Sequence, residues 1–239
     1  MKTESTKKLL YLTVQISLIA QIITGVVDAY ALTLKYTGDF LLIKGLLAIE
    51  LFVQVIEFIF YVWLFSYFTD TSNITPKRYY DWVITTPSML FILIIYLEYL
   101  RNDKTVPDFD GEPTTFNYML HAHEKHGYNF IIILVLNLLM LIFGYLGEIN
   151  LIKNTTAVFY GFIPFILYFY FIYDKYAKYT NNGKILFFIF SGIWGLYGLS
   201  ALCPYLWKNI FYNILDIFSK NFFGIFLAYI AIKNHIKDE

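Results

Sequence analysis

Apolar segments long enough to cross a lipid bilayer occur seven times along this chain of 239 residues, and they limit its fold more than any other feature. A transmembrane helix needs about 20 consecutive apolar residues, whereas helices of soluble domains average about 11–12 residues. The apolar runs cover residues 8–34, 40–68, 76–100, 128–147, 154–173, 184–205 and 208–232. The sequence therefore predicts an all-α bundle of seven transmembrane helices.

The composition supports a membrane location and excludes several classes of function. The chain is 58% hydrophobic, 21% aromatic and 15% charged, and its formal net charge is +0. It contains no block of basic residues and no alternation of basic with aromatic residues, which argues against nucleic-acid binding. Cys203 is the single cysteine, so no disulfide framework or cysteine-based metal site is expected. We expect one integral membrane domain over residues 1–239.

The distribution of basic residues gives a weak indication of orientation. An odd number of spans places the two termini on opposite sides of the membrane. If the N-terminus is outside, the inner loops contain more Lys and Arg than the outer loops, as the positive-inside rule requires. We therefore expect an outer N-terminus and a cytoplasmic C-terminus. A cleaved signal peptide is the alternative for the first run, but a leader has no reason to contain Gln15, Gln21 and Asp28.

A small set of ionisable residues lies deep within the predicted spans, where inserting a charge costs about 2.5–3.5 kcal/mol. The set consists of Glu50 and Glu57 in the second run, Arg78 and Asp81 in the third, and Asp216 and Lys220 in the seventh. Each is a candidate functional residue because of this cost. Asp28, Glu98 and Asp174 lie near the ends of their runs, so we expect them to reach the membrane interface.

Lys220 is the candidate with the most specific chemistry. Asp216 precedes it by four residues, so the two side chains should share a helix face and meet. One interpretation is a structural salt bridge. The other is that the amine condenses with an aldehyde to form a Schiff base, a cation that needs nearby carboxylates. Asp216 and Asp81 could supply two, and Arg78 would offset the repulsion between them.

Three motifs resemble one family. The segment "RYYDWVITTP" at 78–87 resembles the third helix of microbial rhodopsins, and "LDIFSKNFFG" at 215–224 resembles their seventh helix. The segment "WGLYG" at 194–198 is similar to the Trp-x-x-Tyr pattern of their sixth helix, with Gly198 where many members have Pro. Within the family, "KNIFYNILDIFSKNFFGIF" and "WGLYGLSALCPY" look closest to viral rhodopsins, and the glutamates of the second run are similar to those of channelrhodopsins.

The resemblance implies a retinal-binding membrane protein rather than an enzyme. It implies all-trans retinal bound to Lys220 as a protonated Schiff base, with Asp81 and Asp216 as counterions, Asp81 as proton acceptor and Arg78 in support. The residues that it implies around retinal are Trp82, Thr86, Met89, Trp194 and Tyr197. Its partners would be retinal, the lipid bilayer and transported cations or protons, and the resemblance allows a homo-oligomer.

The position of the proton donor bears on the kind of transport. In the best-known proton pumps of the family, a carboxylic donor follows the acceptor by eleven residues, about 16 Å along the same helix. This chain has Ile92 at that position, which cannot carry a proton. A proton pump would need its donor elsewhere, and Glu50 in the second run is the candidate.

Two polar stripes suggest an ion path. Thr13, Ser17, Gln21, Thr24 and Asp28 recur at helical spacing along the first run, as do Glu50, Gln54 and Glu57 along the second. Hydrogen bonds between helices would explain the first stripe, but unpaired glutamates in dry protein are costly. Facing stripes could instead form a wet path whose carboxylates favour cations. Asn213, one turn before Asp216, is a further candidate for this path.

The hypothesis from sequence is therefore a light-gated cation channel. The alternative is an outward proton pump with Asp81 as acceptor and Glu50 as donor, and a photosensory receptor is a third interpretation. A transporter without retinal is the alternative from another class, and it would form no visible pigment. The segment "HAHEKH" at 121–126 has no spacing typical of a metal site, so we expect a solvated, pH-responsive loop there.

Overall fold

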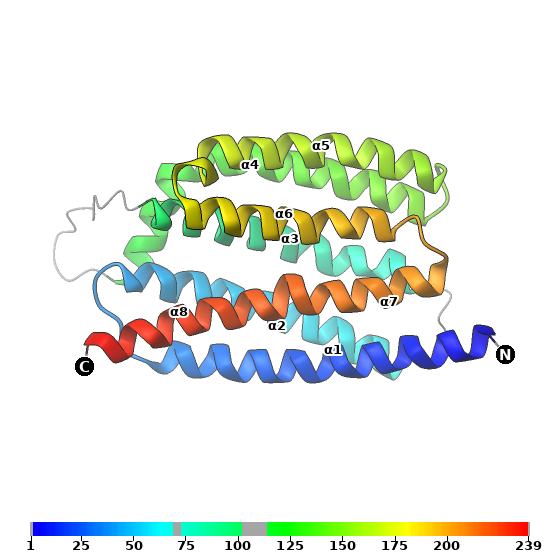
Figure 1. Cartoon of the computed structure of the whole chain (residues 1–239), viewed down its shortest axis with the longest axis horizontal. Coiled ribbons are helices and arrows are strands. Elements are labelled where there is room, and N and C mark those ends of the chain that lie inside the picture. The colour runs from blue at the N-terminus through cyan, green and yellow to red at the C-terminus, as the bar shows by residue number, and fades with distance from the viewer. Residues whose placement is uncertain (1, 69–72, 102–113, 239) are drawn as a thin grey trace.

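The computed structural model describes residues 2–68, 73–101 and 114–238, and these residues form a bundle of seven membrane-length helices (Figure 1). The first six helices are α1 (Lys2–Thr33), α2 (Phe40–Ser66), α3 (Ile74–Leu100), α4 (Thr115–Glu148), α5 (Asn154–Lys175) and α6 (Asn181–Ser200), with a short 3₁₀ turn η1 (Ala177–Tyr179) before α6. The last span is made of α7 (Tyr205–Asp216), a π-helical turn η2 (Ile217–Asn221) and α8 (Phe222–Asp238). The described residues contain no strand, so the predicted fold class is confirmed.

The fourth span begins earlier than the apolar pattern predicts. Its helix starts at Thr115 rather than near residue 128, because the side chain of Thr114 caps it by accepting a hydrogen bond from the Asn117 backbone N–H. The segment at 121–126 is therefore helical, and the expectation of a loop there is wrong. His126 is buried, and its Nδ1 lies 3.4 Å from the Tyr176 hydroxyl. No Gly or Pro interrupts residues 115–126, which explains why the helix can extend past the apolar run.

The helices divide into neighbouring groups that determine where a site can form. α4 and α5 lie side by side at one edge of the bundle, while α1 packs against α2 and against the α7–α8 span at the other (Figure 1). α3 lies between these groups and is buried along much of its length, including the continuous segment from Ile92 to Leu97. The interior of the bundle therefore lies between α3 and the last span, with α1 and α2 on one side and α4, α5 and α6 on the other.

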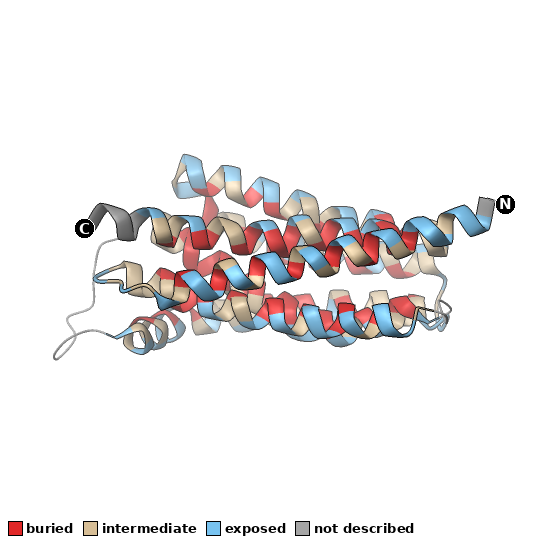
Figure 2. Ribbon diagram, turned by 90° about the horizontal axis from the view of Figure 1, so that it is seen from below, coloured by how far each residue is buried: buried red, intermediate tan, exposed pale blue. Residues whose placement is uncertain are grey.

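The outer surface is apolar. Apart from the fully buried stretch of α3, burial follows one face of the helices, and the opposite face is exposed (Figure 2). The exposed side chains include Ile19, Ile59, Ile131, Phe159 and Phe188. An apolar surface of this extent is stable in hydrocarbon and would aggregate in water, so the chain is an integral, multi-pass membrane protein.

A buried ion pair joins α4 to α7 at the end of the bundle where α7 begins. The Lys208 amine lies 2.7 Å from both carboxylate oxygens of Glu148. Both side chains are less than a tenth exposed. The apolar run begins at residue 208, but α7 already begins at Tyr205, so Lys208 lies within the helix and inside the bundle.

Candidate functional site

Lys220 lies in the π-helical turn η2, near the middle of the last span and in contact with α2 and α3. Its side chain is 3% exposed, and its Nζ lies 2.7 Å from Asp81 Oδ2 on α3. Glu57 Oε1 on α2 is 3.8 Å from the same nitrogen. The amine therefore has two carboxylates within ion-pair distance, from two different helices. The contact between Lys220 and Glu57 could not be predicted, because the sequence pattern places Glu57 on an ion path and not beside the lysine.

The expected contact between Lys220 and Asp216 does not form. Among the described residues, no salt bridge within 4.0 Å joins them. A π-helical turn bonds residue i to i+5, so residues four apart no longer stack as they do in an α-helix. The prediction from α-helical spacing is wrong for this reason.

Asp216 is instead held by a set of strong donors. The hydroxyls of Tyr61 and Tyr197 each donate to it at 2.7 Å, and Arg78 Nη1 donates at 3.2 Å. Charge-assisted hydrogen bonds of this kind stabilise an ionised carboxylate. Its negative charge is therefore fixed in place close to Lys220, without direct contact.

Arg78 is fully buried and belongs to the surroundings of Asp216 rather than Asp81. Its Nε donates to Asn209 Oδ1 at 3.2 Å, and its Nη2 donates to Asn213 Oδ1. The guanidinium carbon also lies 5.0 Å from the Phe60 ring centroid, within cation–π range. These contacts satisfy most of the donors of a charge that would otherwise be costly to bury.

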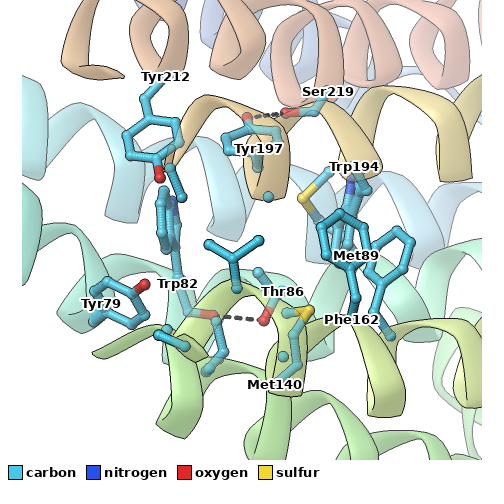
Figure 3. Close-up of a pocket in the computed structure, with 18 of the residues that line it drawn as sticks. Tyr79, Trp82, Thr86, Met89, Met140, Phe162, Trp194, Tyr197, Tyr212 and Ser219 are labelled. Atoms are coloured by element: carbon cyan, nitrogen blue, oxygen red, sulfur yellow. Dashed lines mark hydrogen bonds between the residues drawn. The ribbon is translucent and has the colours of Figure 1, made fainter. Parts of the chain in front are cut away.

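An apolar cavity of about 120 Å³ adjoins Lys220 (Figure 3). Its lining includes the five residues expected around retinal, which are Trp82, Thr86, Met89, Trp194 and Tyr197. A single water needs only about 10–15 Å³ of such volume, so the cavity suits a larger group. Because the walls are aromatic and aliphatic, the group that fits is an apolar one that ends at the amine. Retinal meets this description.

Several residues of the cavity were not expected from the sequence. Tyr79, Met140, Phe162, Tyr212 and Ser219 also line it (Figure 3). Asn137 on α4 is buried behind Thr86 and donates to its hydroxyl at 2.8 Å, and that hydroxyl donates to the Trp82 carbonyl at 2.7 Å. Aromatic and small residues occur throughout this chain, so no sequence signal separates these residues from ordinary core positions.

The polar stripes of α1 and α2 meet α7 and η2 inside the bundle. The contacts include Asn213 Nδ2 to Thr13 Oγ1 at 2.8 Å, Ser17 Oγ to the Asn213 carbonyl at 3.1 Å, Gln21 Nε2 to Asn221 Oδ1 at 3.4 Å, Asn221 Nδ2 to Gln54 Oε1 at 2.9 Å, and Gln54 Nε2 to Glu50 Oε1 at 3.1 Å. We call these seven residues the polar row. Every member is buried, so the row is closed to solvent in this structure.

Three acidic residues that the sequence places at the membrane interface differ in their surroundings. Glu98 and Asp174 pair with lysines near helix ends, at 3.0 Å from Lys125 and 2.6 Å from Lys178. Asp28 is fully buried, so the expectation that it reaches the interface is wrong. It faces α2 and α8, because α1 runs beyond it to Thr33 and places it within the bundle.

The comparisons with known proteins agree with this geometry. A family model described as bacteriorhodopsin-like protein matches residues 11–234, whereas a search of curated proteins finds no match. Among solved structures, viral rhodopsin OLPVRII is 26% identical with a TM-score of 0.80, covering 94% of this chain and 98% of that chain.

Two more distant structures share the fold. A blue light-absorbing proteorhodopsin from Med12 is 18% identical with a TM-score of 0.68, covering 94% of this chain and 98% of that chain. Xanthorhodopsin, described as a light-driven ion pump with dual chromophore, is 15% identical with a TM-score of 0.71, covering 98% of this chain and 96% of that chain. The family model spans nearly the whole chain, and the chain therefore belongs to the bacteriorhodopsin-like family of microbial rhodopsins, which implies a retinal chromophore.

Proposed function

We propose that this protein is a light-gated cation channel in which retinal is bound to Lys220 as a protonated Schiff base. Retinal bound there would supply light absorption and a change of shape within the cavity. The observation that carries the proposal is the polar row, which runs between α1, α2 and the last span and passes Lys220. A cation that crosses the bundle needs oxygen and amide groups of this kind to replace its water.

The acids around Lys220 would have distinct roles. Asp81 makes the shorter contact with Nζ, and its Oδ1 has no hydrogen-bond partner among the described residues. It can therefore serve both as counterion and as acceptor of a proton from that nitrogen. Asp216, which accepts hydrogen bonds from Tyr61, Tyr197 and Arg78, would stay ionised as the second counterion.

Opening would require the contacts around Arg78 to rearrange. Arg78 binds Asp216 and Asn213, and Asn213 also binds Thr13 on α1. Transfer of a proton from Lys220 to Asp81 changes the charges that hold this cluster together. We expect Arg78, Glu57 and Asp216 to exchange partners and let water enter the polar row. Carboxylates at Glu57 and Glu50 would then favour cations over anions.

A light-driven outward proton pump is the second candidate, and one observation favours it. Glu50 is linked through Gln54 to Asn221, the residue after Lys220, on the side of the bundle opposite Arg78. A donor in that place would return a proton to the lysine nitrogen after Asp81 has accepted one. It would also take the role that the buried Ile92 cannot fill.

Voltage clamp of the expressed protein separates the two candidates. With identical solutions on both sides and no applied voltage, a channel passes no steady photocurrent, whereas a pump does. A steady current under these conditions would refute the channel. Lys220→Ala should abolish both the pigment and the photocurrent.

The same recording tests the part played by α2. We expect Glu57→Gln and Glu50→Gln to reduce the photocurrent while the pigment remains intact. Glu98→Gln is the matched control, because Glu98 lies near the end of α3 and away from the polar row. Unchanged currents in both α2 variants would exclude that helix from the path.

A further inference from the structure

Asp28 is a buried acid that the function proposed above does not use. Its side chain is 0% exposed, and neither carboxyl oxygen has a hydrogen-bond partner among the described residues. It lies five residues before the end of α1 at Thr33, about 7.5 Å along the helix axis. A group of this kind does not stabilise helix packing, since it makes none of the hydrogen bonds that would do so.

A glycine on α8 makes room for Asp28. A Cβ atom at Gly224 would lie 2.9 Å from Asp28 Oδ2, 3.0 Å from Thr24 Cγ2 and 3.3 Å from Gln54 Nε2. Side chains from α1 and α2 therefore converge on the bare backbone of α8. The Thr24 hydroxyl and Glu50 Oε2 are also buried without a hydrogen-bond partner. The polar groups with unmet hydrogen bonds are thus concentrated at this point of the bundle.

The polar row links the site to Asn221, the residue after Lys220. Gln54, which approaches Gly224, donates to Glu50 at 3.1 Å and accepts from Asn221 at 2.9 Å. Asp28 and Lys220 are both close enough to Glu50 for their charges to interact with its carboxyl group. Asp28 therefore extends the row beyond Glu50, away from Arg78.

The charges around the site decide its protonation. α2 presents Glu50 to the site, with Glu57 two turns further along, and the last span contributes Lys220, whose charge acts on Glu50. Among the described residues, no salt bridge joins Asp28 or Glu50 to a Lys, Arg or His. Burying an unpaired ion costs several kcal/mol, and a second carboxylate beside it adds repulsion. Two neutral carboxyl groups avoid both costs.

We propose that Asp28 and Glu50 form a carboxyl pair that holds protons in the dark and that Asp28 is the proton-exchange site of this end of the row. Glu50 releases its proton toward Lys220 and becomes a carboxylate. The Asp28 O–H then breaks, its proton passes to Glu50, and Asp28 regains a proton from water at the nearby end of α1. The proposal rests on the polar row of the proposed function, but it holds whether that row conducts cations or protons.

Infrared absorption of the purified protein without retinal tests directly whether the two acids hold protons. At neutral pH, the carbonyl stretch of protonated carboxyl groups is separate from that of carboxylates. Asp28→Asn should remove one such component, and Glu50→Gln should remove another and shift the one that remains. Glu98→Gln, an acid paired with Lys125, should leave the band unchanged. An unchanged band in Asp28→Asn would overturn the proposal.

A second variant keeps the test decisive if Asp28→Asn does not fold. Gly224→Ala retains both acids but places a methyl group against Asp28 Oδ2. It should shift the Asp28 component, and an unshifted component would overturn the proposal. Gly25→Ala is its control on α1, because a Cβ there has no neighbour within 4 Å.

Flash photolysis of the pigment tests the exchange. Loss of a positioned acid–base group typically slows proton transfer by about 10²-fold or more, so Asp28→Asn should slow the return to the dark state to that extent. Recovery at the native rate would overturn the exchange. If the Asp28 infrared component is present but no photocurrent is measured, the transport function is refuted and the carboxyl pair of Asp28 and Glu50 stands. If a photocurrent is measured but the Asp28 component is absent, the carboxyl pair is refuted and the transport function stands.

Discussion

The two carboxylates that contact Lys220 should differ in how strongly they hold a proton on its nitrogen. Asp81 lies 2.7 Å from Nζ and Glu57 lies 3.8 Å from it. At an effective dielectric constant of about 20, the Coulomb attractions are about 6 and 4 kcal/mol. The difference of about 2 kcal/mol corresponds to a factor of roughly 20 in proton affinity. Asp81→Asn should therefore weaken the binding of this proton about 20 times more than Glu57→Gln.

The assay is the visible absorption of the purified pigment as a function of pH. Loss of the proton from the lysine nitrogen removes the long-wavelength band, so the midpoint of this loss reports the proton affinity. We expect the midpoint to fall in both variants and to fall further in Asp81→Asn. Glu98→Gln controls for the loss of a carboxylate elsewhere. A midpoint that falls as far in Glu57→Gln as in Asp81→Asn would refute the reasoning from distances.

Two further predictions concern stability and the cavity. Lys208→Met leaves Glu148 buried without a partner, which should cost about 3–5 kcal/mol of stability and lower the melting temperature. The double variant with Glu148→Met should recover most of this loss. A native melting temperature in the single variant would contradict the prediction. Gly198→Ala places a Cβ 2.6 Å from Phe162 Cζ, so it should cost about 1–3 kcal/mol of stability and shift the absorption band. Gly192→Ala is the control and should do neither, because a Cβ there has no neighbour within 4 Å. Equal behaviour of the two variants would contradict the packing argument.

The spans could be predicted from the sequence because their length and hydropathy are properties of single segments. The helix bounds differ mainly where polar residues continue a helix outside the apolar run, as at Thr115 in α4. A cap such as Thr114 decides this start, and its effect depends on one hydrogen bond rather than on composition. The number and order of the spans are insensitive to such details.

Parts of the site could be predicted because few residue types have the required chemistry. Asp81 and Lys220 stand out as charges in apolar segments, and the structure brings them into contact. The surroundings of Asp216 could not be predicted, because α-helical spacing fails across the π-helical turn. The sequence pattern places Asp28 at the interface, because the residue lies near the end of an apolar run. Its burial depends on the facing helix, where Gly224 leaves space, and a single segment does not contain that information.

Because of the π-helical turn at Ile217–Asn221, the side chains before and after it follow two different helical registers. One added residue rotates everything after it by roughly 100° relative to a regular α-helix. Tyr212 and Asp216 are therefore aimed by one half of the span, and Asn221 and Gly224 by the other. Removing one residue from the turn would leave the length and hydrophobicity of the span almost unchanged. It would nevertheless rotate the α8 half away from α1 and α2 and separate Lys220 from Glu50 and Asp28.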